Sequence, residues 1–414
     1  MITTEQVNTY QELMKERKKL QKKLTKSLRI INIISVIIGL IIGFAISYYG
    51  IFSKNDQSVV DTFLLYFYGG LIAFGITFII HIILHEGGHL IFGLLTGYNF
   101  LSFRIFSTIF YKHNGKINKR KFAIKGTGGQ CLMYPPKRRK DGSFPFVLYN
   151  MGGGISNLFF SLLAVIPAIL TDNKVLLTLC IAFIVSGVLL AVTNLIPLNM
   201  GLQNDGMNMV QMLKEENFRE AFYLQLKVNA EMSDGKLITD YSPSDFPLVE
   251  GENSTNMLAA FSYIYRYYIK LSAHDYEGAR LMLNQMVENS DKYILAIFNL
   301  IEIERLFFMV LEKRPIEEIA CVYRYVRVIL NTSKTNVGIQ RVRYVYEALL
   351  SEDDKKDIIN LISKKVQKKW KDYSEEEAYN DFIKIADNFP IIGEARMHMD
   401  MVEYIRNNYI MDNA

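Results

Sequence analysis

Residues 62–89 read TFLLYFYGGLIAFGITFIIHIILHEGGH, and this stretch decides the fold. Residues 62–84 contain no Asp, Glu, Lys or Arg, and roughly 20 such residues cross the hydrocarbon core of a bilayer as a helix. The next five residues, HEGGH, place two histidines and a glutamate at the end of this apolar segment. Because ionisable side chains in a membrane span are costly and usually functional, the sequence predicts a membrane helix that carries a reactive site.

Three further apolar stretches cover residues 30–52, 144–170 and 175–198. The chain is therefore predicted to be a predominantly α-helical, polytopic membrane protein with four transmembrane helices, at about 30–52, 62–95, 144–170 and 175–198. A purely soluble protein is excluded, and a secreted one is not expected because no cleavage site follows the first stretch. The three cysteines have no paired spacing, which argues against a disulfide framework and against a thiolate zinc site.

The distribution of basic residues predicts the orientation in the membrane. Residues 1–29 carry eight Lys or Arg against three Glu, and residues 98–143 carry eleven against one Asp. Since basic residues accumulate on the cytoplasmic side, we expect both termini and the 98–143 loop in the cytoplasm of a multi-pass cell-membrane protein. The basic run Lys137–Lys140 is expected to contact the lipid bilayer surface, and no nucleic-acid partner is expected.

Composition divides the chain into four predicted parts. A basic cytoplasmic segment (1–29) precedes the membrane domain (30–206), which is followed by an amphipathic segment and linker (207–255) and by a cytoplasmic helical domain (256–414). Within the last part, Asp275–Ala279 and Pro315–Ile319 are typical of turns that open the second helix of a hairpin. The tail is therefore expected to be a helical-hairpin array that can recruit a protein partner.

The HEGGH motif has the residue types and spacing of a zinc site. Four residues advance a helix by little more than one turn, so His85 and His89 share one face and can bind one Zn²⁺. Glu86 lies beside that face and can take a proton from zinc-bound water, whose pKa zinc lowers towards about 7. The alternative is a polar helix end whose histidines pair with neighbours. His81, one turn earlier, is left open between a further ligand, a proton relay and a packed polar residue.

A zinc hydrolase site needs a third protein ligand and leaves the fourth position for water. Asp205 follows the last span and emerges at the same cytoplasmic level as the two histidines, so it is predicted to complete a His₂Asp site, although Asp-Gly is also a common turn. Asn157, in the third span, is predicted to bind substrate or else to hold helices together. The glycines before it, Gly152–Gly154, are expected to let backbones pack closely.

These motifs resemble those of the site-2 protease family of intramembrane zinc metalloproteases over roughly residues 62–206. The resemblance rests on HEGGH at 85–89, on Gly153-x-x-x-Asn157, and on Asn194-x-x-Pro197 leading to Asp205-Gly206. It implies that His85, His89 and Asp205 bind zinc and that Glu86 is the catalytic base. The last motif departs from the family pattern, because Asn199 replaces a proline, Asn204 precedes the aspartate, and three residues are added. The helix is expected to unwind between Pro197 and Gly201 to accommodate them.

The loop after the second span is expected to hold a small β-structure, the β-loop 98–134. The side-chain pattern of residues 101–105 and 122–124 alternates as in short strands, and the glycines at 126, 128 and 129 are typical of turns. The resemblance implies a membrane-associated sheet whose edge pairs with an extended substrate, and the alternative is a plain solvent-facing hairpin.

The function predicted is an intramembrane zinc metalloendopeptidase that cuts near the cytoplasmic face. Its substrate would be a single-span membrane protein or a membrane-inserted leader peptide. Two other functions remain open: a non-catalytic membrane scaffold or sensor with a structural or vestigial zinc site, and a metal transporter that uses the His81, His85 and His89 stripe.

Overall fold

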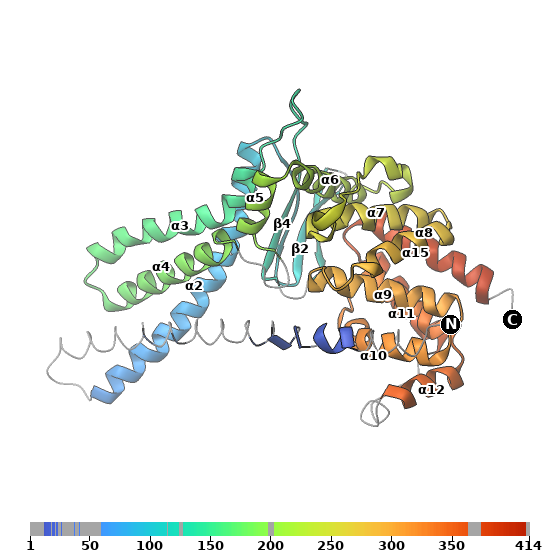
Figure 1. Cartoon of the computed structure of the whole chain (residues 1–414). Coiled ribbons are helices and arrows are strands. Elements are labelled where there is room, and N and C mark those ends of the chain that lie inside the picture. The colour runs from blue at the N-terminus through green and yellow to red at the C-terminus, as the bar shows by residue number, and fades with distance from the viewer. Residues whose placement is uncertain are drawn as a thin grey trace. The chain divides into compact units, whose positions relative to one another are not determined.

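The computed structural model describes residues 12–17, 59–113, 115–123, 127–197, 203–362 and 374–410, with isolated positions between residues 19 and 41. The chain separates into two compact units. The membrane unit comprises residues 20–106 and 126–214, and the helical unit comprises residues 1–19, 107–125 and 215–414. Each unit is described by itself below, and Figure 1 shows their elements.

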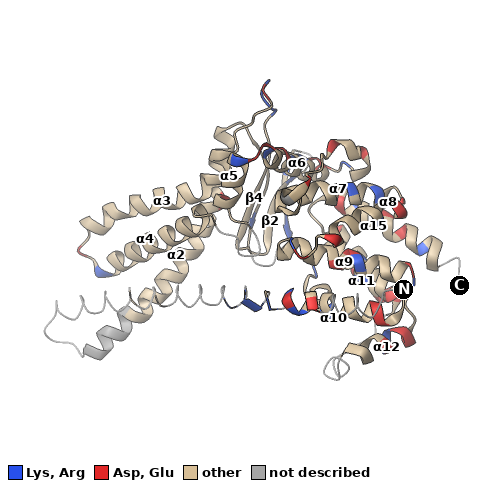
Figure 2. Cartoon of the chain, in the orientation of Figure 1, with Lys and Arg blue, Asp and Glu red and all other residues tan. Residues whose placement is uncertain are grey.

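Three long helices form most of the membrane unit. These are α2 (Val59–Leu95), α3 (Val147–Leu170) and α4 (Lys174–Leu195). Among the described residues, the segments Phe67–Leu95, Val147–Leu170 and Lys174–Leu195 are long and apolar enough to cross a membrane. Figure 2 shows no charged residues in the middle parts of α3 and α4. The predictions of a mostly helical chain and of long apolar helices near these positions are confirmed. The first predicted span, 30–52, lies almost wholly outside the described residues, so the count of four stays a prediction.

Local sequence explains where these helices begin and end. Asn173 caps α4, because its side-chain oxygen accepts from the backbone N–H groups of Val175 and Leu176. The α4 helix ends at Leu195, three residues before the predicted boundary, because a proline disfavours helical geometry in the residue before it, here Ile196. The short helix α5 (Asp205–Lys214) follows, and residues 198–202, where unwinding was predicted, lie outside the described part of the chain.

The loop between α2 and α3 forms four strands in two antiparallel pairs. In the membrane unit, β1 (Asn99–Ile105) pairs with β4 (Gly129–Tyr134), with Phe103 opposite Cys131 and an irregularity between Phe100 and Ser102. In the helical unit, β2 (Thr108–His113) pairs with β3 (Lys116–Lys121). The predicted small sheet is therefore present, and β1 contains the predicted strand 101–105.

The predicted strand at 122–124 is wrong, because β3 ends at Lys121 and the two residues that follow it are not extended in a ladder. The sequence signal failed here for a physical reason. The strand β3 reads KINKRK, and its largely solvated side chains give no apolar alternation that would reveal it.

The helical unit is built from hairpins of consecutive helices. Two of these helices begin at the predicted turns. Helix α8 begins at Tyr276, after its cap Asp275, and α10 begins after Pro315. The unit contains α6 (Glu216–Ser233), α7 (Met257–Ser272), α8 (Tyr276–Glu288), α9 (Leu295–Leu311), α10 (Ile316–Thr332), α11 (Val337–Leu349), α12 (Glu352–Ile362), α14 (Glu375–Asp387) and α15 (Ile392–Ile405). Short 3₁₀ helices η1 (Ile238–Asp240), η2 (Pro243–Asp245) and η3 (Gly251–Thr255) connect α6 to α7, and the π-helical turn η4 (Arg406–Ile410) extends α15.

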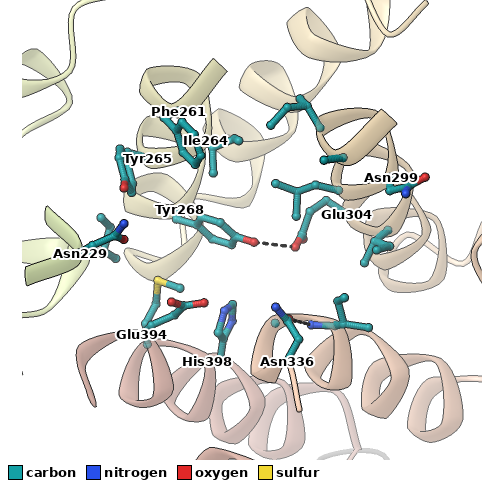
Figure 3. Close-up of a pocket in the computed structure, with 18 of the residues that line it drawn as sticks. Asn229, Phe261, Ile264, Tyr265, Tyr268, Asn299, Glu304, Asn336, Glu394 and His398 are labelled. Atoms are coloured by element: carbon teal, nitrogen blue, oxygen red, sulfur yellow. Dashed lines mark hydrogen bonds between the residues drawn. The ribbon is translucent and has the colours of Figure 1, made fainter. Parts of the chain in front are cut away.

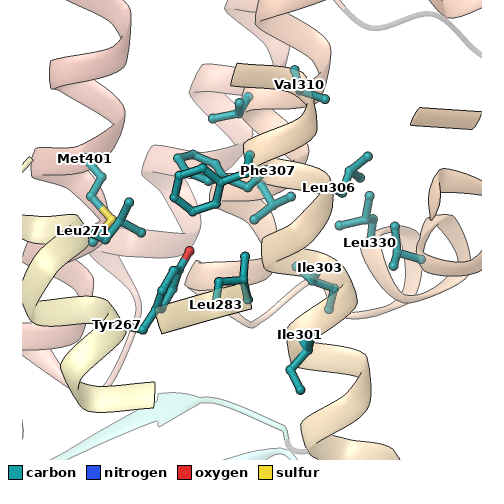
Figure 4. Packing of buried hydrophobic residues seen from close by; sticks show 14 of the residues in the cluster. Tyr267, Leu271, Leu283, Ile301, Ile303, Leu306, Phe307, Val310, Leu330 and Met401 are labelled. Atoms are coloured by element: carbon teal, nitrogen blue, oxygen red, sulfur yellow. The ribbon is translucent and has the colours of Figure 1, made fainter. Parts of the chain in front are cut away.

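One continuous apolar core holds the helical unit together (Figure 4). Helix α9 lies at its centre and buries almost every residue from Ile301 to Val310. A buried ion pair is set into this core: Arg341 donates to both carboxylate oxygens of Glu304, which also accepts from the hydroxyls of Tyr267 and Tyr268. The Glu304 charge is thus neutralised and its oxygens are hydrogen-bonded, as burial of a charge requires.

Candidate metal centre

The last turns of α2 place both motif histidines on one buried face. His85 and His89 are each 8% exposed, and their Nε2 atoms lie 3.2 Å apart. The imidazole rings stand nearly perpendicular, with centroids 4.8 Å apart. This follows from the spacing of four residues, which stacks the two side chains one turn apart on the helix.

The first residue of α5 supplies a third ligand atom. Oδ2 of Asp205 lies 3.2 Å from Nε2 of His85 and 3.3 Å from Nε2 of His89. Asn204 fixes this position, because its Oδ1 accepts from the N–H of Met207 while its Nδ2 donates to the carbonyls of Thr193 and Ile196. Asn204 therefore caps α5 and also ties it to the end of α4.

The spacing of the three ligand atoms fits a tetrahedral metal ion. A zinc ion with bonds of about 2.0–2.1 Å separates its ligand atoms by about 3.3–3.4 Å, and the distances among Nε2 of His85, Nε2 of His89 and Oδ2 of Asp205 are 3.2, 3.2 and 3.3 Å. In the described residues these three side chains form the one group of His, Cys, Asp or Glu with geometry for a metal ion. The donor set of two imidazoles and one carboxylate suits zinc and leaves a fourth position for water.

A backbone carbonyl orients His89. Its Nδ1 lies 2.7 Å from the carbonyl oxygen of Tyr149 in α3, so Nδ1 carries the proton and Nε2 keeps its lone pair for a metal. Tyr149 is itself fixed at its other end: its hydroxyl donates to the carbonyl of Cys131 in β4, and its ring stacks on that of Tyr98. Burial raises the pKa of the Cys131 thiol, which therefore stays protonated.

An amide orients His85. Nδ1 of His85 lies 3.2 Å from Nδ2 of Asn157, and Oδ1 of the same amide lies 3.2 Å from Nδ1 of His81. For Nε2 of His85 to bind a metal, its Nδ1 must carry a proton, so the amide must turn its oxygen towards His85 and its nitrogen towards His81. Asn157 and His81 are both fully buried, and the His81 ring packs on Phe183. His81 thus lies outside the ligand group and contacts it through Asn157.

Glycines allow α2 and α3 to approach closely at the metal centre. A Cβ atom on Gly88 or Gly152 would overlap the backbone of the other helix, and one on Gly153 would overlap the imidazole of His85. The hydroxyl of Ser156 adds a bond from α3 to the carbonyl of Leu84. The expected role of the glycines in close backbone packing is confirmed at these positions.

Glu86 lies beside the ligand group and against β4. It is 8% exposed, and a Cβ on Gly129 would lie 2.5 Å from its carboxylate oxygen Oε1, so a larger residue there would displace the Glu86 side chain. Behind Gly129, the buried guanidinium of Arg104 donates to the carbonyls of Gly129 and Phe106 and to the hydroxyl of Thr127. Burial lowers the pKa of Arg104, although the Glu86 carboxylate opposes this effect.

The structure therefore brings together all five side chains singled out in the sequence, which come from α2, α3 and α5. Sequence reasoning missed the supporting roles of Asn204, Tyr149, Gly129 and Arg104. Asn204 carried a usable signal, since asparagine before a helix is a common cap. The Tyr149 contact is made by a backbone carbonyl, so its side-chain identity gave no sign of it.

Comparison with known protein families gives a match over part of the chain. Residues 72–234 match the family described as Peptidase M50B-like. This segment contains the HEGGH motif, Asn157, Asp205 and β4. No match was found among curated proteins or among solved structures.

Proposed function

We propose, because residues 72–234 match the family described as Peptidase M50B-like, that this chain is a member of the site-2 protease family and an intramembrane zinc endopeptidase. Its substrate would be a membrane-embedded protein or peptide, cut near the cytoplasmic face. The observation that carries the proposal is the convergence of His85, His89 and Asp205 on a point where a metal ion fits, with Glu86 beside it.

The residues have distinct tasks in peptide hydrolysis. A zinc ion held by His85, His89 and Asp205 would supply a Lewis acid that acidifies water and polarises the scissile carbonyl. Glu86 would take the proton from the attacking water and deliver it to the amine that leaves as the C–N bond breaks. The buried setting of Glu86 strengthens these interactions, because little bulk water screens them.

The strand β4 is well placed to hold the substrate. It is an edge strand of the sheet, and its first residue, Gly129, contacts Glu86. An extended peptide that pairs with this edge would run past the metal centre. This arrangement suits the chemistry, because a peptide carbonyl within an intact helix is hydrogen-bonded and shielded from attack.

The helical unit supports the proposed orientation in the membrane. Arg17, from the N-terminal segment, donates to the carbonyls of Ser290 and Tyr293, and Arg120, from the α2–α3 loop, donates to the carbonyl of Phe389. Three chain segments that pack into one unit lie on one side of a membrane. Three described spans separate the α2 start from α5, so a return to the same side requires one more span before α2, as the stretch 30–52 provides.

Metal content tests the centre directly. We expect about one zinc per chain in detergent-purified wild type and a clear loss in Asp205→Ala, with Asp141→Ala, an exposed loop aspartate, as the matched control. One equivalent in both Asp205→Ala and wild type would mean that the third ligand lies elsewhere. If well-folded wild type contains no zinc although zinc was supplied, the alternative function of a non-catalytic membrane scaffold would be favoured.

Catalysis is tested with Glu86→Gln, which removes the base and keeps the shape of the side chain. We expect this variant to retain zinc and to cleave no co-expressed single-span membrane protein that the wild type cuts. Full cleavage by Glu86→Gln would refute the mechanism.

Orientation is tested by cysteine labelling in sealed vesicles, with the three native cysteines replaced by alanine. A membrane-impermeant maleimide should reach Asp172→Cys, in the α3–α4 turn, only from the outer face. It should reach Lys140→Cys and Glu403→Cys only from the cytoplasmic face. Labelling of Lys140→Cys and Glu403→Cys from opposite faces would contradict the proposed topology.

A further inference from the structure

The helical unit contains a cavity that the proposed protease chemistry does not use. Its volume is about 410 Å³, within the range of small-molecule sites. The walls come from α6, η1, α7, α9, α10, α11 and α15. They are mostly apolar, with Phe261, Ile264, Leu300, Ile303 and Met397 among the lining residues (Figure 3).

Two polar groups on α15 face this cavity without partners. Glu394 lines it and makes no hydrogen bond or ion pair within the described part of the chain. One turn further on, His398 is 1% exposed, and its Nδ1 is buried and has no hydrogen-bond partner among the described residues. Buried polar groups are nearly always hydrogen-bonded, so the unpartnered Nδ1 of His398, one turn from the partly buried Glu394, marks a place where a polar ligand group would fit.

The other carboxylate in the lining is already satisfied. Glu304 pairs with Arg341 and accepts from Tyr267 and Tyr268, so it has no charge to offer a ligand. The carboxyl group in the cavity that has no cation beside it is therefore that of Glu394. Tyr265 and Tyr268 of α7 also line the cavity (Figure 3), and tyrosine faces attract cations.

We propose that this cavity binds a small amphiphilic amine, with its ammonium group at Glu394 and His398 and its apolar body against α7 and α9. The ammonium is a positively charged partner for the Glu394 carboxylate. It also provides an N–H donor for Nδ1 of the neutral His398 imidazole. A molecule with one cationic end and an apolar remainder matches a cavity with one charged corner and hydrocarbon walls. This site is independent of the proposed peptidase activity, and its test needs no cleavage assay.

Three probes of equal length test the charge requirement on the full chain in detergent. Isothermal titration with 4-phenylbutylamine should give saturable binding of one molecule per chain. The neutral 4-phenylbutanol should bind at least tenfold more weakly, because a charge-assisted hydrogen bond is stronger than a neutral one. The anionic 4-phenylbutyrate should not bind. Equal binding of amine and alcohol, preference for the acid, or no saturable amine binding would each overturn the proposal.

Two variants in one helix locate the site. Glu394→Gln should weaken amine binding by about 10- to 100-fold, with little effect on the alcohol. The matched control Glu403→Gln changes an exposed glutamate of α15 and should bind the amine as the wild type does. Unchanged amine affinity in a folded Glu394→Gln protein would place the amine elsewhere. The three-probe comparison on wild type decides the charge requirement even if this variant fails to fold.

Discussion

At the scale of single residues, the metal centre depends on which imidazole nitrogen carries the proton. His89 is fixed by a backbone carbonyl, which can only accept a hydrogen bond, so in its neutral imidazole Nε2 keeps the lone pair that binds a metal. His85 depends on Asn157, whose amide can present either an oxygen or a nitrogen. Asn157 is thus the adjustable part of the site, and its effect on His85 differs from the substrate contact predicted from sequence.

Replacing Asn157 separates these two roles. If Asn157 positions His85, Asn157→Leu should lower zinc affinity by about 10- to 100-fold, whereas Asn157→Asp, which keeps an acceptor for Nδ1, should retain most of it. Zinc affinity can be measured by competition with a chelator. Unchanged zinc affinity in Asn157→Leu with a raised KM would instead support direct contact with substrate.

A second residue-scale prediction concerns Gly129. In Gly129→Ala the added methyl would overlap the Glu86 carboxylate, so the general base would be displaced while the zinc ligands stay in place. We expect cleavage to fall by at least tenfold, since small misplacements of a catalytic group are costly, with zinc content unchanged. The control is Gly75→Ala in α2, where a Cβ meets open space. Wild-type cleavage by Gly129→Ala would show that Glu86 does not need its position against β4.

At the scale of elements, the start of α5 decides where Asp205 lies. A carboxylate in the first turn of a helix is stabilised by the helix dipole, and the Asn204 cap holds that turn against the end of α4. Asn204 therefore holds the start of α5 against the end of α4, and this contact does not depend on the path of residues 198–202.

Loss of this cap should weaken the metal site without removing a ligand. Asn204→Ala is expected to cost about 1 kcal/mol of stability at α5 and to lower zinc affinity by less than Asp205→Ala does. Asn208→Ala, in the same helix, is the matched control. If chelator competition gives equal zinc affinity for Asn204→Ala and wild type, the cap does not position Asp205.

Elements differ in how well the sequence reveals them. The spans were predictable because uncharged stretches of this length have few other structures available, and His85, His89 and Glu86 because their spacing on a helix fixes their geometry. The strand β3 was missed because charged side chains on a solvated strand leave no alternation. The contacts of Tyr149 with His89 and of Arg104 with Gly129 could not be predicted because each joins a side chain to a backbone carbonyl far away in the sequence, which local patterns do not encode.

At the scale of the whole molecule, distant segments share one folded unit. Met14 belongs to the core of the helical unit, and the guanidinium of Arg17 lies over the ring of Phe298. From sequence, the basic N-terminal segment indicated only a cytoplasmic location. Its packing could not be predicted, because a short segment with one buried arginine and one buried methionine resembles any charged, exposed helix until its partner surface is known.

The stability of this unit should depend on pH through the cavity. Burial raises the pKa of Glu394 to about 7, from about 4.5 for an ordinary glutamate. The stability due to the protonated folded form is fully present below about pH 4.5 and is lost as pH rises through about 7. His398 acts in the opposite direction, since burial lowers its pKa, so its contribution is fully present above about pH 6.5 and is lost as pH falls below that value. The other titratable groups that line the cavity are Tyr265, Tyr268 and Glu304.

The difference between wild type and Glu394→Gln isolates the glutamate, because His398 is present in both. We expect the wild type to lose stability relative to Glu394→Gln between pH 5 and pH 8, by at most about 3 kcal/mol. Thermal unfolding of the full chain in detergent, followed by circular dichroism across this range, measures the effect, with Glu403→Gln as control. A difference in melting temperature that stays constant from pH 5 to pH 8 would mean that Glu394 ionises normally, and that water or a bound cation already balances its charge.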